Sequence, residues 1–274
     1  MSENTPDISV IMPARDAELY IGDAIRSVLD QQGVDLELII AEDGSRDRTP
    51  EIAAAFAATD PRVRFFTGRG HGFVHALNRL IDEARAPLVA RADADDVNLP
   101  KRLLRQMNYL RSRPGVVCVG GSVLFIDHRG ETLGRGAALL SDDAIQDAAL
   151  RGRSPVCHSA AMYRASAVRA VGGYRRDAHA ATDLDLWLRL GEIGELANIP
   201  DDAIALRQHG ASMTFRVARH LDAAAEHVCR QAARRRGVPP RYERVEDTPI
   251  GVVTATGIGT TAHQSTPVPR ANAG

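Results

Sequence analysis

The amino-terminal part of the chain alternates short apolar runs with longer segments whose apolar residues recur at helical spacing. Short apolar runs are typical of strands buried on both faces, and the longer pattern is typical of amphipathic helices. The pattern predicts strands at residues 8–12, 36–41, 63–66 and 87–91, and helices at 17–31, 47–58 and 71–84. Strands that alternate with helices form a mostly parallel sheet covered on both faces. We therefore expect an α/β domain of the Rossmann-like, nucleotide-binding type.

The pattern changes after residue 96. A helix is predicted at 99–113, a strand and turn that favour a hairpin at 116–130, short helices at 166–171 and 182–190, and a longer helix at 215–236. We expect a single domain over residues 1–237, made of halves at 8–98 and 99–215 and a terminal helix at 216–237. From 238 to 274, Pro, Thr, Ala and Gly predominate. This composition predicts a poorly ordered tail, in which only 250–253 has the pattern of a strand.

Composition excludes several classes of protein. The formal net charge is −1, so the chain lacks the basic footprint of a nucleic-acid binder. No apolar run approaches the roughly 20 residues of a membrane-spanning helix, and the polar start does not resemble a signal peptide. We expect a cytoplasmic protein. The arginines at 234–236 are either a solvated helix face or a peripheral contact with anionic lipid.

Cysteine and lysine usage narrows the chemistry further. The three cysteines are widely separated and form no CxxC pair, so neither a disulfide framework nor a cysteine zinc site is indicated. His71, His75 and His179 have no zinc-ligand spacing either. Lys101 is the only lysine, and it follows Pro100 with no glycine loop before it. A P-loop nucleotidase is therefore excluded.

Polar residues gather where the predicted strands end. They occupy 13–16 after the first strand, 42–47 after the second and 92–96 after the fourth. Ligands of open parallel sheets bind at this edge. Asp47 is either part of this edge or a helix cap.

The three carboxylates of Asp93, Asp95 and Asp96 would repel one another unless a cation compensates their charge. A divalent metal is the simplest such cation. Carboxylates without cysteine indicate Mg²⁺ or Mn²⁺, either of which suits a diphosphate leaving group.

An ordered set of motifs carries a resemblance to a known family. The motifs are IMPARD (11–16), EDGSRDRT (42–49), ALN (76–78), RADADD (91–96), GGY (172–174), DLDLW (183–187) and RQHGAS (207–212). In this order they resemble the family 2 glycosyltransferases of the GT-A fold, over residues 8 to 215. The resemblance implies an inverting transferase that uses a nucleotide-diphosphate sugar, with uridine as the expected base, and Mn²⁺ or Mg²⁺. Its acceptor would be a hydroxyl group of a saccharide or a lipid-linked molecule.

The resemblance also implies roles for individual residues on the donor side. Pro13, Arg15 and Asp43 would line the nucleotide pocket, and Asp43 would read the edge of the base. Asp93 would contact the ribose and Asp95 the metal. The further assignments are His209, as a metal or diphosphate contact, and Asn78, which would help to position the nucleotide-sugar.

On the acceptor side, Asp183 matches the aspartate of the family's Glu-Asp pair, but Thr182 replaces the glutamate. We expect Asp183 to be the general base, because a partly desolvated carboxylate suits that role. The alternative is a charge that only stabilises a helix N-terminus. Asp185 is the second choice as base, or an acceptor ligand. Trp187 either stacks on an acceptor sugar or belongs to the core.

Weaker features leave alternatives open. The glycine-rich stretch at 68–72 is either a phosphate contact or a flexible turn, and His158 and Ser159 are placed either toward the acceptor or in structural roles. Two other functions remain: a sugar nucleotidyltransferase, and a nucleotide-sugar-binding module without catalysis. The lack of a lysine-bearing glycine loop after the first strand counts against the former.

Overall fold

The structure is a computed structural model that describes residues 5–68, 70–210 and 213–244. Its strands are β1 (Ile8–Ala14), β2 (Leu36–Glu42), β3 (Val63–Thr67), β4 (Leu88–Arg91), β5 (Val97–Asn98), β6 (Val116–Ile126), β7 (Thr132–Gly136), β8 (Met162–Arg164) and β9 (Glu195–Arg207). Its helices are α1 (Ile21–Leu29), α2 (Thr49–Thr59), α3 (Phe73–Glu83), α4 (Arg102–Ser112), α5 (Asp142–Leu150), α6 (Ala165–Ala170), α7 (Thr182–Leu190) and α8 (Met213–Arg236). Short 3-10 turns, η1 (His158–Ala160) and η2 (Arg176–Ala178), precede β8 and α7.

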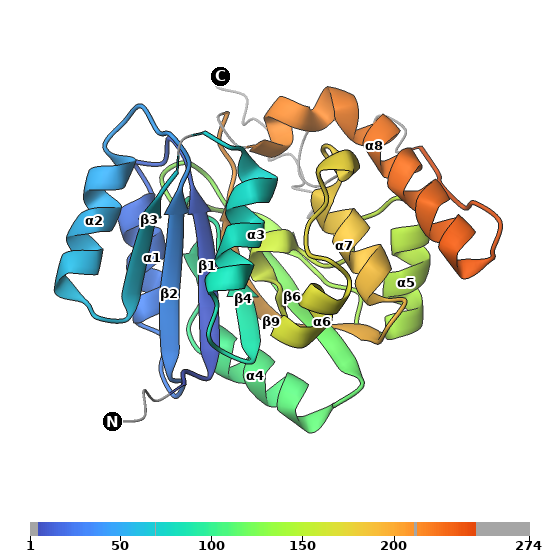
Figure 1. The fold of residues 1–274 in the computed structure, drawn as a ribbon, viewed down its shortest axis with the longest axis horizontal. Coiled ribbons are helices and arrows are strands. Elements are labelled where there is room, and N and C mark those ends of the chain that lie inside the picture. Colours follow the sequence, from blue (N-terminus) through green and yellow to red (C-terminus); the bar gives the residue numbers. More distant parts are fainter. Residues whose placement is uncertain (1–4, 69, 211–212, 245–274) are drawn as a thin grey trace, which may run out of the picture.

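Within these residues all the strands belong to one sheet, in the order β3-β2-β1-β4-β8-β6-β9-β5, and β7 pairs with β6 at the side (Figure 1). The neighbours β3, β2, β1 and β4 are parallel, as are β6 and β9. Strand β8 is antiparallel to both β4 and β6 and so joins the two parallel groups. The β6–β7 pair is the predicted hairpin.

Helices cover both faces of the sheet because alternate residues of each buried strand point to opposite sides. In β1, Val10 and Met12 pack with α1 and α4, whereas Ile11 packs with α3, α6 and α7. All three side chains are buried. This two-sided burial explains why the strand reads as a continuous apolar run.

Two predicted helices begin later in the structure than in the sequence pattern, for a shared reason. The backbone N–H of Ala17 donates to Thr49 Oγ1 (2.7 Å), which holds residues before α1 in a turn. Asp47 accepts hydrogen bonds from the backbone N–H groups of Glu18 and Thr49 (3.0 Å each). Asp47 therefore joins the loop after β1 to the start of α2, and α2 begins at Thr49.

The apolar pattern of the sequence does not predict the strands β5, β8 and β9 or the helix α5. In β9, Pro200 and the pair Asp201–Asp202 interrupt the apolar alternation, and its pairing with β6 shifts register near this point. A proline and two acids are typical of a loop, so the sequence hides the strand. The strand forms because it pairs with β6, and this pairing is visible only in the structure.

Helix α7 is buried around almost its whole circumference. Trp187 has no exposed surface, and its Nε1–H donates to the carbonyl of Val156 (3.1 Å). On another side, Arg189 and Asp185 form an ion pair of 2.5 Å in which both side chains are at most 3% exposed. The helix is thus fixed to the core by an aromatic ring and by a desolvated charge pair.

The described end of the chain packs on this same region. Arg235 pairs with Glu192, and Arg236 donates to the carbonyl of Leu188 and to Gln146 Oε1. Two of the three arginines predicted as a solvated or lipid-facing run thus connect α8 to α7 and α5. Residues 250–253, the predicted strand of the tail, lie outside the described residues.

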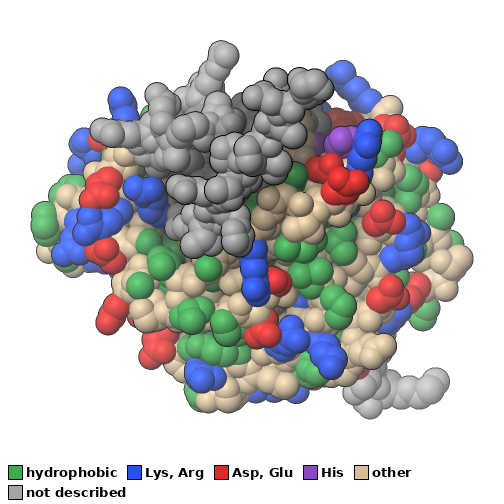
Figure 2. All heavy atoms as spheres, turned by 180° about the vertical axis from the view of Figure 1, so that it is seen from behind, with side chains coloured by type: hydrophobic (Ala, Val, Ile, Leu, Met, Phe, Trp, Pro, Cys, Tyr) green, Lys and Arg blue, Asp and Glu red, His purple; other side chains and the backbone are tan. Residues whose placement is uncertain are grey.

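Charged side chains of both signs are interspersed on the described part of the face in Figure 2. This distribution agrees with the net charge of −1. Among the described residues, no helix combines the length and the apolar content needed to cross a membrane.

Substitution of Asp185 by alanine tests the charge pair of α7. The variant leaves the Arg189 guanidinium buried without its carboxylate, so we expect the free energy of unfolding to fall by about 3–5 kcal/mol. Urea denaturation followed by circular dichroism measures the change. As a control, Glu51→Ala breaks the exposed Arg48–Glu51 pair and should cost about 1 kcal/mol or less. Equal losses in the two variants would contradict the assignment.

Candidate active site

The loops that follow β1 and β2 are joined into one unit at the carboxyl edge of the sheet. Asp16 Oδ1 accepts from the backbone N–H of Arg46 (2.8 Å), and the backbone N–H of Asp16 donates to Ser45 Oγ (3.1 Å). Pro13 is buried at the end of β1, whereas Arg15 extends into solvent. The structure therefore brings the first two predicted loops together and leaves Arg15 accessible to a ligand.

Asp43 lies beside this unit and is only 7% exposed. Its two carboxylate oxygens accept from the backbone N–H groups of His71 (2.8 Å) and Gly72 (2.7 Å). A side chain at Gly68 would place its Cβ 2.8 Å from the carbonyl oxygen of Glu42 and 2.9 Å from Asp43 Oδ1. Glycine at 68 thus allows the loop before α3 to close over Asp43, which fixes the orientation of this carboxylate.

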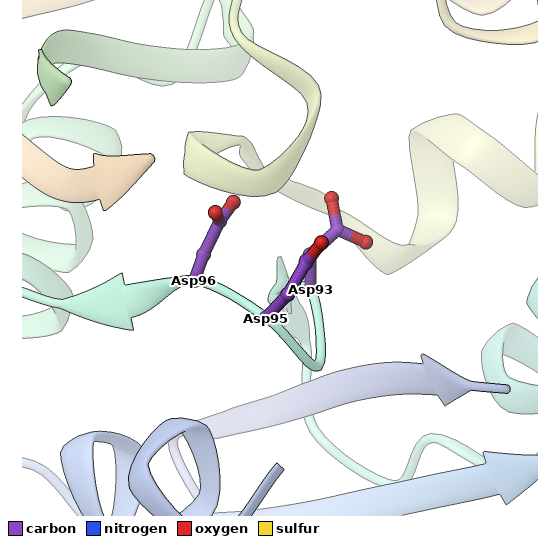
Figure 3. A group of neighbouring side chains, drawn as sticks. All are labelled: Asp93, Asp95 and Asp96. Carbon is purple, nitrogen blue, oxygen red and sulfur yellow. The ribbon is translucent and has the colours of Figure 1, made fainter. Parts of the chain in front are cut away.

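The acidic cluster of Asp93, Asp95 and Asp96 lies in the loop between β4 and β5. One carboxylate oxygen from each of the three lies within 4.8 Å of the others, and the side chains project to the same side of the loop (Figure 3). His209, which follows β9, places Nε2 2.9 Å from Asp95 Oδ2. The structure thus joins two predicted metal-side residues, Asp95 and His209, that are 114 positions apart in the chain.

Protein groups balance part of the negative charge of this cluster. Arg91 has no exposed surface, and its Nη2 lies 2.5 Å from Asp93 Oδ1. Asp96 accepts from the backbone N–H of Arg207 (2.8 Å) and hydrogen-bonds to Ser159. Burial and the neighbouring carboxylates nevertheless raise the pKa of Asp96 well above its usual range, and burial also raises the pKa of Asp93.

The donor atoms at this cluster fit a hard divalent cation. Asp95 and His209 retain 28% and 16% of their side-chain exposure, so both can reach a ligand at the surface of the loop. Carboxylate oxygen with one imidazole nitrogen suits Mn²⁺ or Mg²⁺ and leaves positions for phosphate oxygens. Asp93 and Asp96 bond to protein groups and so hold the loop that carries Asp95.

Asp183 lies in the first turn of α7 and is half-buried. Ser154 Oγ donates a hydrogen bond to its Oδ2 (2.6 Å). Burial raises the pKa of Asp183, and the hydrogen bond from Ser154 opposes this shift. The result is a carboxylate with increased basicity, which is the property that a general base requires.

His158 and Ser159 have structural partners. His158 Nε2 lies 2.7 Å from the hydroxyl of Tyr174, and its ring contacts Phe73 and Trp187 edge-on. Burial, together with the charge of Arg91, lowers the pKa of His158 well below its usual range, so the ring is neutral. Ser159 is buried against Asp96. Both residues are therefore engaged by protein groups, although His158, unlike Ser159, is only half-buried.

Three other predicted site residues are held by the protein itself. Both amide atoms of Asn78 bond to the backbone of Tyr174, at 2.8 and 2.9 Å. Asp185 and Trp187 are buried in the contacts that hold α7. The structure therefore gives Asn78 a positioning role in the core and removes Asp185 and Trp187 as direct contacts of an acceptor.

The sequence alone predicts no role in the site for Arg91, Ser154 or Arg207. Arg91 carried a readable signal, because a charged residue that ends an apolar strand directly before three aspartates predicts a buried ion pair. Ser154 lies in none of the motifs, and Arg207 begins the motif RQHGAS (207–212) but had no assigned role. Their partners Asp183 and Asp96 are 29 and 111 positions away.

Comparison with known proteins places the chain in a family. Residues 9–172 match glycosyl transferase family 2. The chain is 35% identical to EpsE of Bacillus subtilis, which is named as a glycosyltransferase, over 193 residues that cover 69% of this chain and 68% of EpsE. It is 28% identical to chondroitin synthase of Escherichia coli over 199 residues, which cover 72% of this chain and 28% of that protein.

Solved structures of low sequence identity share the fold. The mannosyltransferase PcManGT from Pyrobaculum calidifontis, solved with GDP-Man and Mn²⁺, matches with a TM-score of 0.63 at 19% identity, over 87% of this chain and 67% of that one. S. aureus TarS 1–349 in complex with UDP-GlcNAc matches with a TM-score of 0.58 at 14% identity, over 84% and 72% of the two chains. The predicted α/β fold of the GT-A type is confirmed, and the chain belongs to glycosyl transferase family 2.

Proposed function

We propose that this glycosyltransferase is metal-dependent and inverting, and that it transfers a sugar from a nucleotide-diphosphate sugar, with UDP as the expected nucleotide, to a hydroxyl group of a saccharide or lipid-linked acceptor. The Asp95–His209 pair carries the proposal, because it joins a carboxylate and an imidazole at the sheet edge where the nucleotide loops meet. The Mn²⁺ in the mannosyltransferase structure supports a divalent metal. GDP-Man in that structure and UDP-GlcNAc in TarS support a nucleotide-diphosphate sugar as donor, and the choice of UDP follows from the family resemblance.

On the donor side, the rigid loops bind and orient the nucleotide. Asp43, fixed by two backbone N–H groups, would accept from the edge of the base, with Pro13 and Arg15 beside it. Asp93, held by Arg91, would accept from the ribose. Asp95 and His209 would hold the cation. When bound, this cation neutralises the charge that develops on the leaving diphosphate.

On the acceptor side, Asp183 would take the proton of the attacking hydroxyl as that oxygen bonds to the anomeric carbon. Inversion requires attack opposite the leaving diphosphate, so the base must act from the side away from the metal. The raised pKa of Asp183 supports this role because it strengthens the carboxylate as a proton acceptor. Thr182 stands in place of the family's glutamate and is buried. The other carboxylate of this turn, Asp185, is paired with Arg189, so Asp183 is the candidate base.

Family membership favours transfer over the two alternatives from sequence analysis. A sugar nucleotidyltransferase would need a different phosphate-binding loop after the first strand, where this chain has the IMPARD motif. A binding module without catalysis would not need a half-buried carboxylate such as Asp183, which is costly to retain without a role.

Substitution of Asp95 by asparagine tests the metal site. The change removes one negative charge from the Asp95–His209 pair, so the turnover of the nucleotide-sugar should fall by about three orders of magnitude. Nucleotide binding should also lose its dependence on Mn²⁺ in calorimetric titrations. Asp82→Asn changes an exposed aspartate elsewhere and is the matched control, with activity expected to stay at the wild-type level. Unchanged metal dependence in Asp95→Asn would contradict the assignment.

Substitution of Asp183 by asparagine separates binding from transfer. Loss of a general base lowers turnover by about 10²–10⁴-fold. The dissociation constant of the nucleotide-sugar should stay at its wild-type value, because Asp183 is placed on the acceptor side. Transfer assays measure the turnover, and equilibrium titration measures the dissociation constant of the nucleotide-sugar. Transfer at the wild-type rate would show that Asp183 is not the general base. Asp185→Asn is not an equivalent test, because it changes the buried Asp185–Arg189 pair.

The pH profile tests the environment of Asp183. Ser154→Ala removes the hydrogen bond that stabilises the ionised carboxylate, so the pKa of Asp183 should rise further. Because the base acts when deprotonated, the acid limb of kcat/KM should move to higher pH, by about one unit. Ser112→Ala, at an exposed hydroxyl at the end of α4, should leave the limb in place. A limb that does not move, or that moves to lower pH, would show that another group is titrating.

A further inference from the structure

A pocket of about 290 Å³ lies between the start of α3 and the segment that leads into α7. Residues 71–75 form one wall, and Arg176, His179, Ala180 and Thr182 form the other. Its volume is near the lower end of small-ligand pockets, which begin at about 300 Å³. It therefore suits one small group rather than a whole nucleotide.

Groups that donate hydrogen bonds to anions line both walls of the pocket. Four of the nine lining residues carry imidazole or guanidinium groups, and none is acidic: the four are His71, His75, His179 and Arg176. All four are exposed, and in the described part of the chain none takes part in an ion pair. The rings of His71 and His75 lie 5.0 Å apart, so two imidazoles stand close together on one wall. The guanidinium group matches phosphate and carboxylate in a two-bonded geometry.

The same residues do not form a metal site. Among the described residues, Asp93, Asp95 and Asp96 form the one group of histidine, cysteine or acidic side chains close enough to share an ion. The three histidines of the pocket are not in such a group. An anion therefore fits these walls better than a cation does.

The position of the pocket indicates which substrate it would serve. None of the aspartates of the acidic cluster lines it, so it is distinct from the place proposed for the leaving diphosphate. Thr182, which does line it, directly precedes Asp183, the proposed base. The wall at Thr182 thus adjoins the acceptor side of the reaction, whereas the wall at His71 and Gly72 holds Asp43 of the nucleotide side.

We propose that this pocket binds an anionic group of the acceptor, of the phosphate or carboxylate class, and so positions the acceptor hydroxyl near Asp183. The proposal rests on the proposed transferase function for the identity of the substrate, but the anion site itself does not. Arg176 would supply a positive charge, and His75 a hydrogen bond, from opposite walls. An acceptor without an anionic group would lose these contacts.

Titration with inorganic phosphate tests the anion site without any transfer reaction. In the full chain, NMR signals of the His71, His75 and His179 rings should shift together and saturate. The double variant His75→Gln/Arg176→Gln should weaken phosphate binding at least about tenfold, which corresponds to about 1.4 kcal/mol. The matched control, His227→Gln/Arg230→Gln, changes one histidine and one arginine on the exposed face of α8 and should bind phosphate as the wild type does. Absence of saturable shifts, or equal weakening in both variants, would overturn the site.

Transfer assays then test the source of the anion. Two acceptors that differ only in a phosphate group should differ in kcat/KM with the wild-type chain, and this ratio should approach one in His75→Gln/Arg176→Gln, while the KM of the donor stays constant. A change confined to the KM of a donor whose sugar carries a carboxylate would instead assign the pocket to the donor and overturn the acceptor proposal. Phosphate binding without transfer of any sugar would contradict the proposed function and leave the anion site standing.

Discussion

The loop that carries Asp93, Asp95 and Asp96 depends on buried positive charges that compensate its carboxylates. Arg91 and Arg102 are both fully buried beneath the loop of Asp93, Asp95 and Asp96. Arg91 balances Asp93, and Arg102 donates to the carbonyl oxygens of Arg91 (2.8 Å) and Ala161 (3.3 Å), where β4 meets β8. Burial lowers the pKa of Arg102 to about 10, so it stays charged at neutral pH. The protein thus places two fixed cations under its carboxylates, and the loop keeps its shape before any ligand arrives.

This fixed charge explains how one edge of a sheet can serve two kinds of chemistry. Asp93 and Asp96 have partners in the protein, whereas Asp95 keeps an exposed oxygen beside His209. On the other side of the proposed reaction, Asp183 has a single hydroxyl partner in Ser154 and a raised pKa. Asp93 and Asp96 are thus oriented by protein groups, whereas Asp95 and Asp183 keep partial exposure, which a metal contact and a proton transfer require.

Much of this edge was predictable from the sequence, and the limits have physical causes. The apolar runs of β1, β2 and β4 place the ends of three strands, and therefore Asp43 and Asp95, because buried parallel strands show a strong local pattern. Strand β9 was not predicted, since Pro200 and two aspartates break its alternation and its stability comes from pairing with β6. The roles of Trp187 and Asp185 could not be decided from the sequence for a different reason. Spacing shows which residues share a helix face, but α7 is buried on nearly every face, so spacing could not show which side meets a ligand.

The position of β9 late in the chain determines when the Asp95–His209 pair can form during synthesis. This strand adds in parallel beside β6, and only after it does His209 arrive at Asp95, from 114 positions along the chain. Contacts of such sequence separation form slowly because a long segment must first be ordered. During synthesis, the loops after β1 and β2 can therefore take their final shape while the second half is still being made, and the Asp95–His209 pair is among the last parts of the edge to assemble.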